Sequence, residues 1–189
     1  MKEYTECARE MLEFIDKSPT CFQAVKNIGD MLSAAGLAEL READEWKFER
    51  GKGYFVTRNE SSVIAFRIPE QLSGFHIAAA HSDSPSFKVK ESPESTVEEH
   101  YVRLNTEKYG GMILSTWLDR ALSVAGRIAV NGEKGIETRL VNVDKDLLVI
   151  PNVAIHMNRD MNNGVAYNPQ VDMLPLFADC SDGEKRGLM

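Results

Sequence analysis

The sequence has few cysteines, no long hydrophobic run and no excess of basic residues. Its three cysteines, Cys7, Cys21 and Cys180, are odd in number and lack CxxC spacing, which argues against a disulfide framework and a cysteine zinc knuckle. We expect them to be reduced and mostly buried. No run approaches the roughly 20 apolar residues that cross a bilayer, and the first residues lack the apolar core of a secretion signal. We therefore expect a cytoplasmic protein without a membrane partner.

Charge and missing motifs exclude several function classes. The formal net charge is -7 and the lysines and arginines are scattered, so the basic patch of a nucleic-acid binder is absent. The sequence has no GxSxG elbow, Walker glycine loop, GxGxxG or HExxH motif. These absences argue against the familiar serine hydrolases, P-loop proteins, dinucleotide-binding folds and zincins.

Two amphipathic helices are predicted at the start of the chain. Apolar residues recur at three- and four-residue spacing over residues 4–15 and again over residues 22–35. We expect the first helix to end near residues 18–19. Gly36 follows the second pattern, where a glycine commonly ends a helix.

Three short strands are predicted next. Residues 53–59, 61–68 and 75–81 are rich in β-branched, aromatic or small apolar residues and are separated by turn-forming residues. The third, "FHIAAAH", is apolar on both faces, as in a central strand covered by helices. Together with the two helices, this pattern predicts a layered α/β domain.

An acidic stretch follows at residues 91–99. It contains a proline and lacks apolar periodicity, which is typical of a crossover or a domain boundary. A second, β-rich module is predicted to begin after it, and from residue 162 the sequence is typical of a loop. The expected strands of this module are residues 100–104, 112–118, 122–130, 138–143 and 146–157.

His81 and Asp83 stand at the end of the third predicted strand. Residues i and i+2 of an extended chain point the same way, so the two side chains can lie together. A metal-binding histidine typically donates its other ring N–H to a carboxylate, and open α/β sheets build ligand sites at strand ends. His-x-Asp is nevertheless a common tripeptide. The alternative is a surface turn in which Asp83 hydrogen-bonds the backbone before Ser84-Pro85.

Two further candidates have ordinary structural explanations. His156 lies in an apolar segment beside Asn158 and Arg159, which could bind a carboxylate. Without such a role, His156 would be a histidine of the core or of a strand edge, with its ring nitrogens hydrogen-bonded within the protein. Asp119 stands next to Arg120, and the simpler interpretation is a local ion pair that caps a helix or strand.

Several motifs in fixed order resemble one family. They are "FIDKSPTCFQAV", "YFVTRN", "IAFRIP", "AAHSDSPSFKVK", "YGGMILSTWLDRALSVAGR", "RLVNV" and "IPNVAIHMNRD". Their order and separations resemble those of the aspartyl aminopeptidases, a family of co-catalytic zinc exopeptidases. The resemblance runs from the first helix to about residue 178. It implies an enzyme that removes acidic N-terminal residues from peptides and assembles into large homo-oligomers.

The resemblance also implies a fold, a cofactor and site residues. The fold would be part of a zinc-exopeptidase-like α/β sandwich, residues 1–91, followed by an incomplete β-rich inserted dimerisation domain, residues 92–189. The cofactor would be zinc, with two divalent ions in a complete site and manganese or cobalt as alternatives. His81 corresponds to a metal ligand and Asp83 to the catalytic carboxylate that orients it. His156 corresponds to a histidine assigned either to the metal site or to the substrate.

This chain departs from the family in length. The bridging aspartate, the Glu-Glu pair with the general base, a further acidic ligand and the final histidine are missing, and Asp119-Arg120-Ala121 stands where the family often has Asp-Arg-Asp. We expect the chain alone to be a weak or inactive peptidase. It is then the N-terminal portion of an aminopeptidase, which needs a complementary C-terminal half. The alternatives are a non-catalytic oligomerisation or regulatory module and a small metal-binding protein.

Overall fold

The computed structural model describes residues 2–133 and 135–179. The chain divides into two compact units: Met1–Ser84 with Ala125–Asn142, here the first unit, and Pro85–Val124 with Val143–Met189, here the second unit. Helices and small sheets occur together, so the predicted mixed α/β class is confirmed. The assignment of residues 1–91 to a catalytic domain and of residues 92–189 to a dimerisation domain stays a prediction, because the structure does not test which role each part has.

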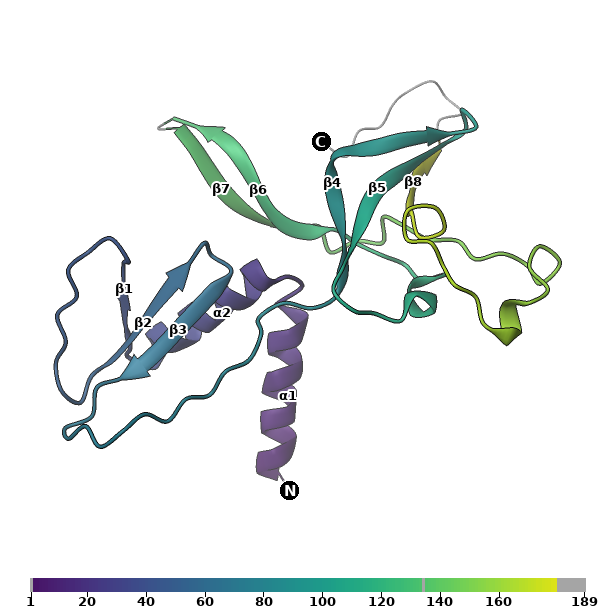
Figure 1. The fold of residues 1–189 in the computed structure, drawn as a ribbon. Helices are drawn as coiled ribbons and strands as arrows, with labels where there is room; N and C mark the ends of the chain where they lie inside the picture. Colours follow the sequence, from purple (N-terminus) through teal and green to yellow (C-terminus); the bar gives the residue numbers. More distant parts are fainter. Residues whose placement is uncertain (1, 134, 180–189) are drawn as a thin grey trace. The chain divides into compact units, whose positions relative to one another are not determined.

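Both predicted helices are present in the first unit (Figure 1). Helix α1 spans Lys2–Asp16 and α2 spans Cys21–Ala34. The Thr20 hydroxyl accepts a hydrogen bond from the Phe22 N–H and caps the start of α2. Gly36 follows α2 with a φ of 81°, the left-handed conformation that glycine adopts without strain.

The first sheet has the order β1-β2-β3, formed by Ala38–Leu40, Gly53–Arg58 and Ser62–Arg67. Strands β1 and β2 are parallel, and β2 and β3, both predicted as strands, pair antiparallel. Phe55 of β2 is only 1% exposed and lies against Gly29 of α2, where a Cβ would stand 3.5 Å from the ring. Helix α2 therefore covers one face of this sheet.

Aromatic side chains gather on the opposite face. Tyr54 alternates with Phe55 along β2 and therefore points away from α2. Its ring centroid lies 5.8 Å from that of Phe66 and 5.3 Å from that of Phe48. Trp46 contacts the same cluster, with its centroid 6.1 Å from that of Phe48. The segment between β1 and β2 thus folds over the sheet through its aromatic residues.

The prediction of a third strand at residues 75–81 is wrong for this chain. Residues 75–81 are neither helix nor strand. Phe75 and Ile77 are 83% and 86% exposed, although a buried position was expected for them. A central strand exists only when neighbouring strands satisfy its backbone groups on both sides. Among the residues that the structure describes, no strand does so here.

A hairpin from the middle of the sequence belongs to the first unit. Strands β6, Ala125–Gly132, and β7, Gly135–Asn142, confirm two predicted strands. Gln23 of α2 donates a hydrogen bond to the Val141 carbonyl at 2.9 Å. The Arg127 guanidinium donates to the Asn59 carbonyl at 2.7 Å and lies 4.4 Å from the centroid of the Phe22 ring. These contacts join the hairpin to α2 and to the β2–β3 turn.

The second unit contains the sheet β4-β5-β8, formed by Ser86–Val97, Tyr101–Tyr109 and Leu176–Asp179. Strand β5 confirms a prediction, whereas β8 was not expected. The expected break at residues 91–99 is wrong, because residues 91–97 lie inside β4. The pairing with β5 instead shifts register between Val89 and Glu94. A proline that cannot donate to the ladder is accommodated at such a bulge.

Two other predicted strands are only partly present or absent. Residues 112–118 contain a 3-10 helix, Leu114–Trp117, in which the Thr116 hydroxyl donates to the Ile113 carbonyl at 2.7 Å. Such local bonding competes with strand pairing. The segment 146–157 makes isolated bridges at 148–150 and then leaves the sheet at Pro151, which has no N–H to donate. A second 3-10 helix, Met161–Asn163, overlaps the start of the expected loop.

The core of the second unit contains one unsatisfied hydroxyl. Thr106 of β5 is 1% exposed, and its Oγ1 has no hydrogen-bond partner among the described residues. An unsatisfied buried group costs about 1–3 kcal/mol. We expect Thr106→Val, which keeps the shape, to raise the free energy of unfolding by about 1 kcal/mol in urea denaturation. Thr138→Val is the control, because the Thr138 hydroxyl donates to Glu60 at 3.1 Å; equal gains in both variants would contradict the assignment.

The cysteines and the helices bear on two further expectations. Cys7 is exposed and Cys21 is half-buried, and both are free thiols. The expectation that the cysteines are mostly buried is therefore wrong for Cys7, while Cys180 lies outside the described residues. Within residues 2–133 and 135–179, neither helix is long and apolar enough to cross a membrane.

Candidate functional site

The predicted His81–Asp83 pair is present in the first unit. The Nδ1 atom of His81 lies 2.7 Å from the main-chain carbonyl oxygen of Asp83 and 3.1 Å from its Oδ1. The His81 side chain is 81% exposed, whereas that of Asp83 is 37% exposed. The i, i+2 spacing has therefore brought the imidazole and the carboxylate together, as predicted.

This geometry determines which ring nitrogen of His81 can bind a ligand. Both atoms facing Nδ1 are oxygens that only accept hydrogen bonds when the carboxylate is ionised. In the neutral imidazole Nδ1 therefore carries the proton, and Nε2 keeps its lone pair. That arrangement is the one in which a neutral imidazole binds a metal through one nitrogen while a carboxylate orients the other.

A serine anchors the pair to the first sheet. The Ser82 hydroxyl donates a hydrogen bond of 2.9 Å to the main-chain carbonyl of Ser61, at the β2–β3 turn. This bond fixes the backbone between His81 and Asp83. No local sequence pattern predicts this role of Ser82, because the bond spans 21 residues.

His156 occupies an exposed turn of the second unit instead of a strand. The turn contains a hydrogen bond of 2.8 Å from the Met157 N–H to the Ala154 carbonyl. The two histidines belong to different units. The exposed position excludes the alternative of a buried core histidine and leaves the imidazole accessible to a ligand.

Asp119 supports the segment that leads to His156. Its Oδ1 accepts a hydrogen bond of 2.9 Å from the Asn152 N–H, and its own N–H donates to the Ile150 carbonyl at 2.9 Å. It has a φ of 55°, which is unusual for a residue other than glycine. The expected local ion pair with Arg120 is therefore replaced by a cap on the backbone at residues 150–152.

The described part of the chain lacks a complete metal site. None of its His, Cys, Asp and Glu residues form a group of three or more that could hold an ion. The His81–Asp83 pair offers one ligand atom and one orienting carboxylate. Zinc sites normally use at least three protein ligands. The donor set thus fits a zinc ligand and its support, and further ligands must come from elsewhere.

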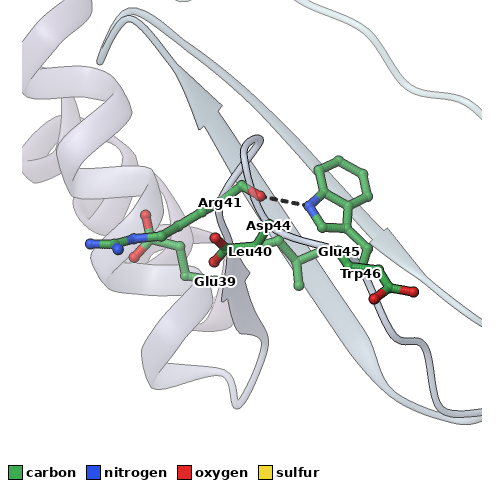
Figure 2. Close-up of a pocket in the computed structure, with 6 residues that line it drawn as sticks. All are labelled: Glu39, Leu40, Arg41, Asp44, Glu45 and Trp46. Atoms are coloured by element: carbon green, nitrogen blue, oxygen red, sulfur yellow. Dashed lines mark hydrogen bonds between the residues drawn. The ribbon is translucent and has the colours of Figure 1, made fainter.

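A shallow pocket in the first unit has a different chemistry (Figure 2). Its volume is about 370 Å³, and it is lined by Glu39, Leu40, Arg41, Asp44, Glu45 and Trp46. The indole N–H of Trp46 donates to the Arg41 carbonyl at 2.7 Å. The lining contains no histidine, cysteine or hydroxyl group, so it offers neither an imidazole ligand nor a thiol or hydroxyl nucleophile.

An ion pair in the same part of the first unit shifts two pKa values. The Arg58 Nε–H donates to Glu42 Oε1 at 2.8 Å. This hydrogen bond, helped by the attraction between the charges, lowers the pKa of Glu42 and raises the pKa of Arg58. Both groups are exposed, and such surface pairs contribute little to stability.

The sequence matches a known family over most of its length. The family described as "Aminopeptidase I zinc metalloprotease (M18)" matches residues 14–186. A "Probable M18 family aminopeptidase 2" of Clostridium novyi is 48% identical over 187 residues, which are 96% of this chain and 43% of that relative. The chain therefore spans less than half the length of this curated relative.

Solved structures of related proteins have the same fold in the matched part. A chain in the cryo-EM structure of an Ape4 and Nbr1 complex gives a TM-score of 0.90 at 37% identity, covering 97% of this chain and 36% of that one. The structure of Chaetomium thermophilum mApe1 gives 0.83 at 32% identity, covering 95% of this chain and 41% of that one. Both structures extend well beyond the region that this chain spans.

Proposed function

This chain belongs to the aminopeptidase I (M18) family of zinc metalloproteases, and from that membership we propose that it is the N-terminal portion of a metallo-aminopeptidase. The proposed reaction is the hydrolysis of the first peptide bond of substrates with an acidic N-terminal residue. The observation that carries the proposal is the His81–Asp83 pair, which presents one ring nitrogen and fixes the other. The proposed location is the cytoplasm.

His81 and Asp83 have complementary roles in this proposal. His81 binds the metal through Nε2, and the Asp83 carboxylate holds the ring through Nδ1 and raises its basicity. Zinc held there would supply polarisation of the scissile carbonyl and a more acidic water molecule. Ser82, bonded to Ser61, keeps both residues in place. A second divalent ion, or manganese or cobalt in place of zinc, belongs to the same proposal.

His156 is proposed to bind either the substrate or the metal. Its exposed turn allows it to face a substrate or a second subunit. A protonated imidazole with Arg159 nearby in the sequence would attract the acidic side chain of the substrate. The second unit is then the part that dimerises and shapes the substrate pocket in a homo-oligomer.

The chain alone is proposed to be weakly active or inactive. One histidine with its carboxylate does not hold a catalytic metal, because zinc needs more ligands. The general base is also missing from the sequence. Both must come from the part of the family's length that this chain does not span.

The test is activity with and without that missing part. The chain would be co-expressed with the remaining portion of the Clostridium novyi relative and assayed on N-terminal aspartyl, glutamyl and leucyl peptides. We expect turnover of the acidic substrates only in the pair, dependent on zinc, manganese or cobalt and abolished by a chelator. Equal turnover by the isolated chain would contradict the proposed incompleteness, and a folded, metal-loaded pair without turnover would contradict the peptidase function.

A second candidate is a non-catalytic oligomerisation or regulatory module. The observation in its favour is the exposed apolar face of α1, formed by Tyr4, Met11, Leu12 and Ile15. An unpaired apolar face favours association. Stable dimers of the isolated chain without metal, measured by sedimentation, would support this candidate. A monomeric chain would support the first candidate, the N-terminal portion of an aminopeptidase.

A further inference from the structure

The turn between β2 and β3 has a strained backbone. Asn59 and Glu60 have φ angles of 52° and 55°, in the left-handed region that asparagine tolerates and glutamate rarely adopts. Hairpin turns with two left-handed residues favour glycine at the second position. A strained backbone persists only where its surroundings hold it, and such positions cluster near functional groups. The contacts that hold this turn therefore bear on its function.

Arg127 of β6 holds the turn through its guanidinium. This group donates to the Asn59 main-chain carbonyl at 2.7 Å and to its Oδ1 at 3.3 Å, and it lies 3.3 Å from Glu60 Oε2. The Phe22 ring packs against the same guanidinium, and the Thr138 hydroxyl adds a 3.1 Å bond to Glu60 Oε1. The planar fork of arginine thus reaches a carbonyl, an amide and a carboxylate of the turn at once, which the point charge of a lysine does not do.

The same turn carries the anchor of the His81–Asp83 pair. Its last residue is Ser61, whose N–H closes the turn through a main-chain hydrogen bond of 3.1 Å. The Ser61 carbonyl accepts the 2.9 Å bond from the Ser82 hydroxyl, and Ser82 lies between the proposed metal ligand and the carboxylate that orients it. The position of the turn therefore sets the position of the backbone that joins the imidazole to its carboxylate.

We propose that Arg127 is a positioning residue for the His81–Asp83 pair. By fixing the Asn59–Glu60 turn, it fixes the Ser61 carbonyl to which Ser82 is anchored. Among the described residues, its hydrogen bonds go to the turn and not to the pair, so it acts through the turn. This inference rests on the proposed function and adds a residue of the β6–β7 hairpin to the support of the metal ligand.

The alternative is that Arg127 only attaches the hairpin to the first unit. The hairpin has another attachment, because Gln23 of α2 donates to the Val141 carbonyl at 2.9 Å. Loss of the arginine is therefore expected to loosen the turn while the hairpin stays attached. The two roles differ in one consequence. Positioning makes the effects of Arg127 and Ser82 depend on each other, whereas simple attachment leaves them additive.

The first test is a double-mutant cycle on zinc affinity, measured by chelator competition in the co-expressed pair of this chain and the remaining portion of the Clostridium novyi relative. We expect Ser82→Ala and Arg127→Ala each to weaken zinc binding about 3–30-fold. The double variant should bind no worse than the weaker single variant, because both act through the Ser61 carbonyl. Arg139→Ala is the control, since this arginine of the same hairpin lies 3.7 Å from Glu137; it is expected to bind within about twofold.

The second test needs neither metal nor a partner. The nitrogen-15 shifts of the His81 ring in the isolated chain, at a pH where the ring is neutral, report which nitrogen carries the proton. We expect Arg127→Ala to lower the share of the Nδ1–H form, because a loosened backbone weakens the contact of Nδ1 with Asp83. Circular dichroism checks that each variant is folded. Arg127→Lys keeps the charge but not the fork, so it is expected to shift both measurements in the same direction.

Four outcomes would overturn the inference: additive losses in the cycle, an equal loss in Arg139→Ala, an unchanged ring proton in Arg127→Ala, or full recovery in Arg127→Lys. A pair that binds no zinc or cleaves no peptide would contradict the proposed function. If the ring proton still depended on Arg127 in the isolated chain, the positioning role would stand without it. An active pair whose zinc affinity did not depend on Arg127 would do the reverse.

Discussion

Replacing His81 by alanine is expected to lower turnover of an N-terminal aspartyl peptide by more than about a hundredfold in the completed, metal-loaded protein. The reason is that Nε2 of His81 is the proposed ligand atom of this chain, while Asp83 lies against Nδ1. Losing a supporting residue of a metal site typically costs about 10–100-fold, and losing a ligand costs more. The measurements are kcat/KM and bound zinc by mass spectrometry.

Two further variants make this prediction specific. Asp83→Asn keeps the size of the side chain but removes its charge, so an intermediate loss of about 10–100-fold is expected. His100→Ala removes another exposed histidine, from the turn before β5, and is expected to leave turnover and zinc content unchanged. If the His81→Ala variant kept its zinc and its activity, His81 would not be a ligand. The same would follow if His100→Ala lost as much turnover and zinc as His81→Ala.

The parts of the fold that could be predicted from the sequence are those determined by local patterns. Helix α2 has an apolar stripe, a threonine cap and a following glycine, all within a few residues of one another. Strands β2 and β3 form a hairpin whose partners adjoin in sequence. In each case the residues that stabilise the element lie close by, so composition and spacing were sufficient.

The errors occur where stability depends on distant residues. Residues 75–81 have the composition of a central strand, but a strand also needs neighbours, which the described chain does not provide. The β6–β7 hairpin was assigned to the second module by its position in the sequence. The structure attaches it to the first unit through Gln23 and Arg127, whose hydrogen bonds span 118 and 68 residues respectively.

The candidate site shows the same division. The proximity of His81 and Asp83 follows from alternation over three residues and was predicted. The bond from Ser82 to Ser61 and the cap that Asp119 places on Asn152 span 21 and 33 residues, and no local pattern announces them. The incomplete ligand set was expected from the residues that the sequence lacks.

Phe55→Ala is expected to lower the free energy of unfolding of the first unit by about 3–5 kcal/mol, the usual cost of truncating a buried phenylalanine. Phe55 is 1% exposed and fills the contact between β2 and α2 at Gly29. Urea unfolding followed by Trp46 fluorescence measures the loss, with Trp117 of the second unit replaced by phenylalanine so that only the first unit reports.

Phe75→Ala is the matched variant, because it removes the same side chain from a position that is 83% exposed. In the isolated chain it is expected to change stability by no more than about 0.5 kcal/mol, as exposed substitutions do. If Phe75→Ala destabilised the isolated chain as much as Phe55→Ala, residues 75–81 would already be packed there. The first unit would then need no partner to complete its sheet.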